Sequence, residues 1–327
     1  MENGALSLDE FSCLMDEVGI DPSAPLCVAV SGGADSMAMT ILASKWCNKG
    51  HFVTFDHDLR EGSRKEALQV TAWLSELDLK HVILTWDGEK PTSDIQAQAR
   101  GARYNALENY CIKNEIPNLL LGHHRDDQAE TFFIRLLRGS GIKGLSAMEK
   151  ISKPNTTHSG PKLVRPLLDI PKERLIKTLE EIGQPWIEDP SNENESFLRV
   201  KVRKLLETTN IEGLERDRLA DTAKRMQRAN DFLEREVGSF IHQNCKVKDE
   251  NSCTINLNSF SILHEEIALR ALSFILMRFG KVNYPPRLKK IERLYENCLR
   301  SDYKGSTLSR CRVWTEEGNI FIRKEFK

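Results

Sequence analysis

The chain has 327 residues, of which 40% are hydrophobic and 29% are charged, and its formal net charge is −1. This composition excludes a wholly disordered chain, a collagen-like chain and a membrane bundle, since no stretch approaches the roughly 20 apolar residues of a spanning helix. The length favours two domains. The first 30 residues hold six acidic side chains and no Lys or Arg, whereas targeting signals are basic, so we expect a cytoplasmic protein with no membrane partner.

The first half of the sequence alternates short apolar runs with stretches of helical periodicity. The apolar runs predict strands at residues 26–30, 51–55, 81–84 and 119–122. Apolar stripes and a capping Ser93 predict helices at residues 36–47, 63–77 and 93–113, and a fourth that ends near residue 138. Strands that alternate with helices indicate a parallel α/β sheet, which places its ligands at the carboxyl ends of the strands.

The second half begins with a polar stretch, residues 151–162, which predicts a surface loop. A helix is expected from Pro171, capped by Asp169, to Gly183. Helical patterns then dominate, most clearly at residues 217–241 and 264–279, and the alternating runs 307–314 and 319–323 predict a β-hairpin. The predicted fold class is α/β: a doubly wound parallel sheet in residues 1–208, followed by a mainly helical domain in residues 209–327 that ends in a β-hairpin.

The distribution of charge and the spacing of the cysteines suggest where a polyanion could bind and which state the thiols adopt. Residues 281–327 carry twelve Lys or Arg against six Asp or Glu, so this end is the better candidate for contact with a polyanion, although a solvated basic face explains the charge equally well. We find no basic strand rich in aromatic residues, so the sequence does not predict a surface for stacking the bases of a single strand. We interpret Tyr104, Trp186 and Trp314 as core or edge residues. The eight cysteines form no Cys-x-x-Cys pair, which favours reduced thiols.

The strongest motif is Ser31-Gly-Gly-Ala-Asp-Ser36, which follows the first strand and opens a helix. Glycine lets the backbone turn sharply and approach a ligand, and the helix N-terminus offers free N–H groups and a partial positive charge. Together these features favour a phosphate site, although a capped turn uses the same residue types. Asp35 is unusual beside phosphate and suggests Mg²⁺ carried by a nucleotide.

Two further pairs of charged residues lie at helical spacing. Asp127 and Glu130 are three residues apart, so they share a helix face and suit an ammonium ligand; a solvated acidic helix start is the alternative. A metal site that adds His123 and His124 to these carboxylates is a weaker reading. Arg100 and Arg103 are also three apart and suit phosphate oxygens, or simply a surface helix.

The phosphate loop resembles that of the N-type ATP pyrophosphatases. Further segments in the same order resemble the tRNA(Ile)-lysidine synthetase family over roughly residues 25–205. They are Asp56-His-Asp-Leu-Arg60, Gln96-Ala-Gln-Ala-Arg-Gly-Ala-Arg-Tyr104, Gly122-His-His-Arg-Asp-Asp-Gln-Ala-Glu-Thr131, Arg165-Pro-Leu-Leu168 and Glu188-Asp-Pro-Ser-Asn192. The chain departs from the family pattern at Arg199-Val-Lys-Val-Arg203, where the family carries Asn and Arg in place of Val200 and Lys201.

The resemblance implies ATP-dependent ligation of L-lysine to C2 of the wobble cytidine (position 34) of tRNA(Ile) with a CAU anticodon. The reaction would pass through an adenylated cytidine, give lysidine and release AMP and pyrophosphate, with ATP and Mg²⁺ as cofactors. The implied catalytic residues are Asp35, Arg103, Asp127 and Glu130, of which the last two also bind lysine. The implied ATP-binding residues are Ser31, Gly32, Gly33, Ala34, Asp35, Ser36, Asp56 and His57. The candidates for contacts to phosphate or RNA are Arg100, Arg138, Arg199 and Arg203.

Two other classes compete with this interpretation. A tRNA thiolase of the same superfamily would usually carry clustered cysteines, which this chain lacks. A non-enzymatic RNA-binding protein with a decayed loop is the other, and it is disfavoured because Asp35, Arg103, Asp127 and Glu130 are all present. Arg138 leads into a glycine-rich loop, residues 139–144, which predicts either a lid or a contact to RNA phosphate; an ordinary helix end explains Gly139 equally well.

Overall fold

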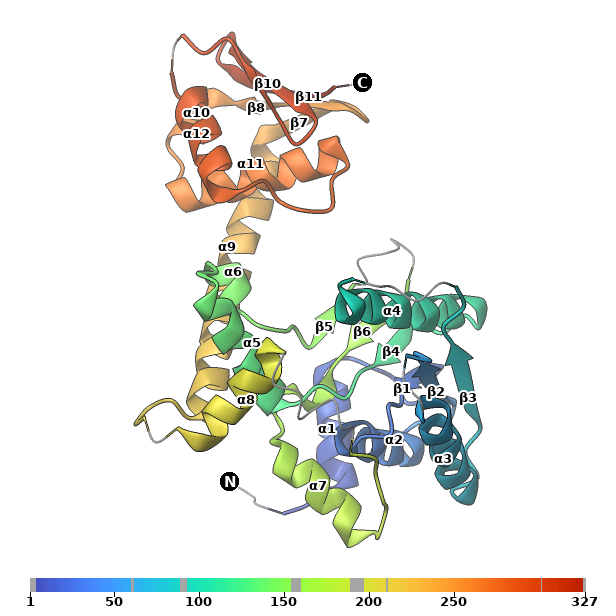
Figure 1. Ribbon diagram of the computed structural model, residues 1–327. Helices are drawn as coiled ribbons and strands as arrows, with labels where there is room; N and C mark the ends of the chain where they lie inside the picture. Colours follow the sequence, from blue (N-terminus) through green and yellow to red (C-terminus); the bar gives the residue numbers. More distant parts are fainter. Residues whose placement is uncertain are drawn as a thin grey trace. The chain divides into compact units, whose positions relative to one another are not determined.

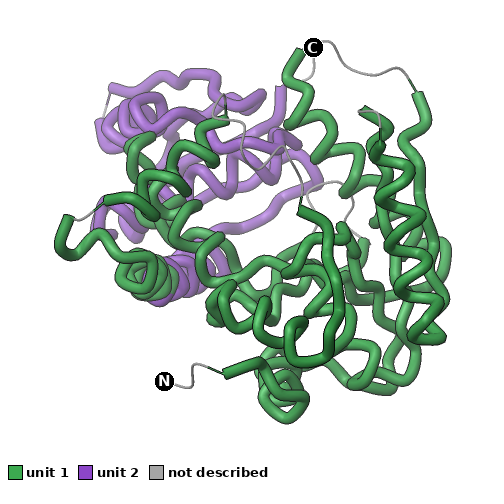
Figure 2. Tube along the Cα trace, turned by 60° about the horizontal axis from the view of Figure 1, so that its bottom comes forward, with its two compact units in different colours: residues 1–227 green, residues 228–327 purple. Residues whose placement is uncertain are grey.

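The computed structural model describes residues 4–59, 62–88, 93–153, 160–188, 197–209, 211–300 and 302–325. The chain forms two compact units, residues 1–227 and 228–327 (Figure 2). The sequence predicts a boundary after residue 208, whereas the division lies inside the long helix α9 (Arg216–Asn244). The first turns of α9 pack in unit 1 through Leu219 and Ala223, and its last turns pack in unit 2 through Val237 and Phe240.

Unit 1 contains a sheet with strand order β3-β2-β1-β4-β6-β5 (Figure 1). All neighbours in it pair in parallel except β5 and β6. The predicted parallel α/β sheet is therefore confirmed. The strands are β1 (Leu26–Ala29), β2 (Gly50–Asp56), β3 (His81–Thr85), β4 (Asn118–Leu120), β5 (Ile151–Ser152) and β6 (Lys162–Val164).

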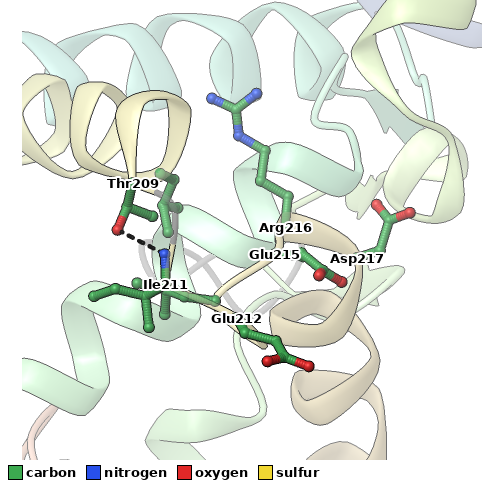
Figure 3. Close-up of a pocket in the computed structure, with 8 residues that line it drawn as sticks. Thr209, Ile211, Glu212, Glu215, Arg216 and Asp217 are labelled. Atoms are coloured by element: carbon green, nitrogen blue, oxygen red, sulfur yellow. Dashed lines mark hydrogen bonds between the residues drawn. The ribbon is translucent and has the colours of Figure 1, made fainter.

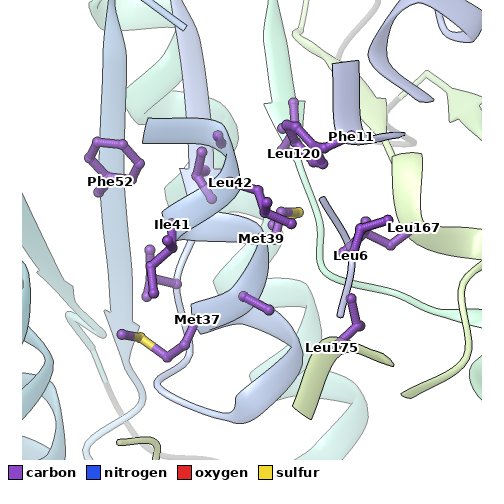
Figure 4. Close-up of a cluster of buried hydrophobic side chains, with 14 of the residues drawn as sticks. Leu6, Phe11, Met37, Met39, Ile41, Leu42, Phe52, Leu120, Leu167 and Leu175 are labelled. Carbon is purple, nitrogen blue, oxygen red and sulfur yellow. The ribbon is translucent and has the colours of Figure 1, made fainter. Parts of the chain in front are cut away.

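Helices cover both faces of this sheet because its central strands are apolar on both faces. Leu26 and Val28 of β1 join one core, while Cys27 joins the other. Helix α2 (Ala34–Trp46) lies in the larger core (Figure 4), and nearly all of its first ten residues are buried, which is why it shows no amphipathic stripe. The other helices of the unit are α1 (Leu8–Glu17), α3 (Ser63–Glu76), α4 (Ile95–Lys113), α5 (Arg125–Leu137), α6 (Ile142–Leu145), the 3-10 turn η1 (Pro166–Asp169), α7 (Lys172–Glu181) and α8 (Leu198–Thr208).

Two predicted helix caps are wrong. Helix α4 is preceded by Asp94, whose φ of 47° places it in the left-handed region, and not by Ser93. Helix α7 is preceded by Pro171. Asp169 instead ends the 3-10 turn and accepts ion pairs from Lys150 at 2.8 Å and Lys224 at 3.2 Å. Ion pairing thus replaces the expected capping role. Part of the predicted 151–162 loop, residues 154–159, lies outside the described residues.

Unit 2 is a five-stranded antiparallel sheet, β7-β8-β11-β10-β9, with helices α10, α11 and α12. The predicted hairpin is confirmed as β10 (Cys311–Glu316) and β11 (Asn319–Lys324). The expected single strand 307–314 is instead two strands, because Ser309 and Arg310 turn the chain with φ of 50° and 62°. The remaining elements are β7 (Cys245–Asp249), β8 (Ser252–Asn256), β9 (Ser306–Leu308), α10 (Leu257–Ser261), α11 (Glu265–Gly280) and α12 (Leu288–Cys298).

The described residues form no helix with the length and apolarity needed to cross a bilayer. All eight cysteines are free thiols, and five of them are fully or almost fully buried: Cys27, Cys111, Cys253, Cys298 and Cys311. The buried thiols lie in the hydrophobic cores, as expected of reduced cysteines in a chain with no Cys-x-x-Cys pair.

Candidate functional site

The phosphate loop closes on itself at the carboxyl end of β1. The Ser36 hydroxyl donates to the Gly33 carbonyl oxygen at 3.0 Å and accepts from the Ser31 amide and from the Ser31 hydroxyl, each at 3.0 Å. Gly33 caps helix α2, so the N–H groups of the first helical turn, which have no partner within the helix, face the loop. The loop therefore offers the N–H donors and positive helix end that an anion needs.

Glycine is required at two positions, Gly32 and Gly122, because neighbouring atoms approach the backbone too closely for a Cβ atom. Gly32 has φ +86°, and a Cβ there would lie 2.8 Å from Ile187 and 2.9 Å from Val70. Its carbonyl oxygen also accepts from the Ile187 amide at 2.8 Å. A Cβ on Gly122, at the end of β4, would lie 3.2 Å from the Ser36 backbone. The phosphate loop and the segment after β4 are therefore packed backbone to backbone, which brings Asp35 beside the start of α5.

His124 connects these two segments. Its Nε2 lies 3.3 Å from Asp35 Oδ2 and 3.4 Å from Asp127 Oδ2, and its backbone amide donates to Asp127 Oδ2 at 3.0 Å. The imidazole is buried. Burial lowers the pKa of His124, but the neighbouring Asp127, Asp35 and Asp126 carboxylates outweigh it and raise the pKa above its usual value. The other oxygen of Asp35, Oδ1, is buried and has no hydrogen-bond partner within the described part of the chain.

The carboxylates of Asp127 and Glu130 are paired with two arginines of α8. Arg199 donates from Nε to Glu130 at 2.6 Å and from Nη2 to Asp127 at 2.5 Å. Arg203 donates from Nε to Glu130 at 2.7 Å. The Glu130 side chain is 1% exposed and that of Asp127 is 12% exposed. Burial raises the pKa of Asp127, but the charges of His124 and Arg199 outweigh it and lower the pKa.

This arrangement explains the departures in the Arg199–Arg203 stretch. The two outer arginines are four residues apart, so both reach Glu130 from one helix face. Val200 is buried on another face, and Lys201 is exposed. Neither departure removes a contact to the acidic pair. Arg199 and Arg203, expected at phosphate or RNA, instead contact carboxylates here, and residues 189–192 of the preceding motif lie outside the described residues.

A basic cluster surrounds Tyr104 on α4. The guanidinium carbons of Arg100 and Arg103 lie 5.0 and 5.4 Å from the Tyr104 ring centroid, and Arg100 also donates to its hydroxyl at 3.1 Å. Burial, assisted by the charges of Arg165, Arg100 and Arg103 and opposed by Asp127, lowers the pKa of His123 to about 3. Within the described ranges, no carboxylate forms an ion pair with Arg103, so its charge remains available to an anion.

Arg165 is a functional candidate that the residue-by-residue predictions leave out. The residue is only 7% exposed, and its Nη1 donates to the Glu149 carbonyl oxygen at 3.0 Å and to Ser152 at 2.9 Å. Its Nε is buried with no hydrogen-bond partner among the residues described. The Arg165-Pro-Leu-Leu168 motif was the available signal. His124 was found only as part of the weaker metal interpretation, because sequence cannot show that it faces Asp35.

Asp56 and His57 lie at the carboxyl end of β2. Asp56 is buried and accepts from the Asp58 amide at 3.0 Å and the Ser63 hydroxyl at 2.8 Å. The His57 ring packs edge-on against Phe55, with centroids 4.8 Å apart. Both residues are therefore at the edge of the sheet where parallel strands end, as predicted, and Asp56 already has structural partners.

The glycine-rich segment after α5 is held by Arg135, whose Nη1 donates to the Gly144 and Ala147 carbonyl oxygens at 2.8 and 2.7 Å. Arg138, by contrast, is exposed at the end of α5. Gly139 adopts φ +67°, the left-handed conformation of a helix end. The helix-end interpretation therefore accounts for Gly139, while exposed Arg138 retains its candidacy for a phosphate contact.

A pocket of about 550 Å³ opens where α8 meets α9 (Figure 3). It contains none of the predicted site residues. Arg216 in its lining lies 3.4 Å from Asp126, and Asp217 pairs with Arg125 at 2.7 Å, so these polar groups hold the start of α9 against α5. The lining residues are Leu206, Thr209, Ile211, Glu212, Leu214, Glu215, Arg216 and Asp217.

The described residues contain no group of three or more His, Cys, Asp or Glu side chains arranged to hold a metal ion. The His123–His124–Asp127–Glu130 metal site is therefore not formed. The reason is geometric, because Glu130 faces Arg199 and Arg203 while His124 faces Asp35.

Comparison with known proteins identifies the family. Residues 9–209 match the PP-loop domain, whose family uses ATP. The tRNA(Ile)-lysidine synthase of Wolbachia pipientis wMel is 36% identical over 305 residues, which cover 91% of this chain and 70% of that protein. The synthase of Rhodopseudomonas palustris is 40% identical over 277 residues, covering 82% of this chain and 78% of that protein.

Among solved structures, the U34-tRNA thiolase NcsA from Methanococcus maripaludis with its [4Fe-4S] cluster has a TM-score of 0.55 at 16% identity. The match covers 68% of this chain and 77% of that one, and it shows a shared fold alone. The sequence relatives give stronger evidence of the family, because identities above a third extend over most of both chains. Together with the phosphate loop at β1, they show that this chain belongs to the tRNA(Ile)-lysidine synthase family of PP-loop proteins.

Proposed function

We propose that this protein ligates L-lysine to C2 of the wobble cytidine of tRNA(Ile) with a CAU anticodon, giving lysidine. The cytidine O2 first attacks the α-phosphate of ATP and releases pyrophosphate; the lysine ε-amine then attacks C2 and AMP leaves. The observation that carries the proposal is the contiguous arrangement of the phosphate loop, His124 and Asp127 at the carboxyl ends of β1 and β4. An ATP site and an acidic site thereby share one edge of the sheet.

The loop of residues 31–36 would hold the phosphates of ATP through its N–H groups. The orphaned Oδ1 of Asp35 fits a cation beside those phosphates, because a buried carboxylate oxygen without a partner is costly unless a ligand meets it. Mg²⁺ bound there with the phosphates would neutralise charge that develops on them. Arg103, with no carboxylate partner in the part of the chain described, would stabilise the same charge.

The lysine ammonium requires carboxylate acceptors, and the two candidates differ in access. Glu130 is almost fully buried and bound by two arginines, whereas the side chain of Asp127, although buried, keeps 12% exposure and contacts only one arginine. We therefore assign Asp127 as the group that meets lysine and accepts its proton before attack. Glu130 is assigned as a positioning residue, which holds Arg199 and Arg203 and through them the face of α8 that borders the site.

The test is incorporation of radiolabelled lysine into an unmodified tRNA(Ile) transcript with a CAU anticodon, in the presence of ATP and Mg²⁺. A transcript with uridine in place of the wobble cytidine is the control. Label that depends on ATP and appears only in the first transcript is the expected result. Pyrophosphate release without label would remove lysine as the nucleophile, and neither signal from folded protein that binds the RNA would remove the ligase proposal.

A further inference from the structure

The outer face of the unit 2 sheet combines aromatic and basic side chains. Residues alternate along β10 and β11, so Val313 and Ile322 enter the core while their neighbours point away from it. Helices α10 and α11 contact the core side of this sheet (Figure 1). We call the opposite side the outer face, and its aromatic and basic members are Lys246, Lys248, Arg312, Trp314, Phe321 and Arg323.

The strand register places these side chains together. Trp314 pairs with Phe321, and Arg312 pairs with Arg323, across β10 and β11. Phe321 pairs with Thr254 of β8, which in turn pairs with Lys246 of β7. Because directly paired residues point to the same side of a sheet, one row runs from Lys246 through Phe321 to Trp314.

The two aromatic rings form a stack. Their centroids are 5.2 Å apart and their planes are inclined by 11°. A cation lies over each ring: Lys248 Nζ is 4.9 Å from the Phe321 centroid, and Arg312 Cζ is 5.9 Å from the Trp314 centroid. Both rings are partly exposed, and all four cations of the face are exposed. The outer face of either ring therefore becomes accessible to a ligand when Lys248 or Arg312 changes its side-chain rotamer.

A purely structural role explains only part of this surface. A stacked cross-strand pair stabilises a hairpin, but it does not require four cations around it. Two carboxylates border the face: Glu316 accepts from the Trp314 indole at 3.2 Å, and Asp249 lies near Arg323. The face still has an excess of positive charge. Exposed aromatic rings among cations are the surface on which proteins stack unpaired nucleobases and hold the adjoining phosphates.

We propose that the outer face of unit 2 binds an unpaired nucleotide of the RNA substrate. A base extends the Trp314–Phe321 stack in place of Lys248 or Arg312, and the displaced cation meets the neighbouring phosphate. A base inside a duplex has both faces occupied, so the site selects a loop or an end of the RNA. The proposal rests on the proposed function only in taking RNA as the substrate, and requires neither adenylation nor lysine transfer.

Binding of the CAU transcript to the full-length protein tests the contact. Trp314→Ala is expected to weaken affinity about tenfold, since a stacked base contributes strongly to binding, whereas Trp314→Phe keeps affinity within about threefold. Phe232→Ala, an exposed aromatic of α9, is the matched control and leaves affinity unchanged. Thermal unfolding shows whether each variant is folded. Lys248→Gln, a surface change, gives a second variant that weakens binding a few-fold and lowers its salt dependence.

Photochemical cross-linking locates the nucleotide. Ultraviolet irradiation of the complex followed by mass spectrometry is expected to find nucleotide adducts on the peptide that holds Trp314 or Phe321. Wild-type affinity in folded Trp314→Ala, with adducts only outside β10 and β11, would overturn the proposal, as would equal competition by an RNA duplex. Binding that depends on Trp314 in a protein that transfers no lysine would reject the proposed function alone.

Discussion

The Asp35 carboxylate has a buried oxygen without a hydrogen-bond partner among the described residues, which is uncommon in folded proteins. Its Oδ1 is buried and lacks a hydrogen-bond partner among the residues described, while its Oδ2 lies 3.3 Å from His124 Nε2. A buried acceptor without a partner costs about 1–3 kcal/mol. Such a cost persists in a folded protein where a ligand relieves it. The position beside the phosphate loop is consistent with a cation that accompanies nucleotide phosphates.

The first prediction concerns this oxygen. Asp35→Asn keeps the size of the side chain but removes its charge, so pyrophosphate release in the presence of the CAU transcript should fall by about 100-fold or more. The melting temperature should fall only slightly, because Oδ1 has no protein partner and the amide oxygen of Asn can still accept from His124 Nε2. Asp16→Asn, an exposed carboxylate on α1, is the control. Full activity of Asp35→Asn would show that the loop acts without this carboxylate.

The second prediction concerns His81, whose ring nitrogens each lie 2.8 Å from a threonine hydroxyl, of Thr71 and Thr54. Burial lowers the pKa of His81 to about 4. The unfolded chain binds a proton near pH 6.5 and the folded chain does not, so stability is lost as pH falls from about 6.5 toward 4. Urea unfolding should show a smaller loss over this range for His81→Gln. An identical pH profile in the variant would contradict the assignment.

At the scale of elements, helix α8 is attached to the site by charge. Arg199 and Arg203 lie one turn apart and converge on Glu130, which is 1% exposed. A buried ion pair of this kind contributes little when complete, but removal of one member leaves uncompensated charge. The apolar residues Val202 and Leu206 of α8 pack with Ala129 and Phe132 of α5. Apolar packing therefore holds the two helices together, and the ion pairs with Glu130 fix the position of α8 along α5.

The third prediction follows from this attachment. Glu130→Gln should lower the free energy of unfolding by about 2 kcal/mol, because two arginines lose their shared counter-charge. Asp127→Asn should cost less stability and should instead raise KM for lysine, with pyrophosphate release retained. Glu207→Gln, at the exposed end of α8, is the stability control. The assignment of roles fails if Glu130→Gln alters KM for lysine with no loss of stability.

The sequence predicts these elements unequally well. Buried strands such as Leu26–Ala29 and the strand–loop–helix around residue 31 are found because their signals are local. The convergence of Arg199 with Glu130, 69 residues earlier, is tertiary and leaves no local signal. The outer face of unit 2 was missed for the same reason: Trp314 and Phe321 become neighbours only through the hairpin register. Strand β7, Cys-Lys-Val-Lys-Asp, was missed because its polar composition is not that of a buried strand.

At the scale of the whole molecule, the chain holds separate cores. The phosphate loop belongs to unit 1, whose cores flank the parallel sheet, whereas the core of unit 2 lies between its antiparallel sheet and helices. Division of the chain into units with their own cores suits a protein that must position a large RNA and also enclose a small reaction site. Each unit should then respond separately to a ligand that it alone contacts.

The fourth prediction uses this independence. The proposed binding of ATP with Mg²⁺ to the phosphate loop requires the folded chain, so at about 100 times Kd it should stabilise the loop's surroundings by about 2.7 kcal/mol. Hydrogen exchange of the full-length protein should slow in β1 and at the start of α2, and should be unchanged in β8 and β11. Asp35→Asn should reduce the protection, because the cation would lose its protein ligand. Equal protection in both units would instead show that nucleotide binding in unit 1 is coupled to unit 2, since a ligand stabilises only the states that it favours.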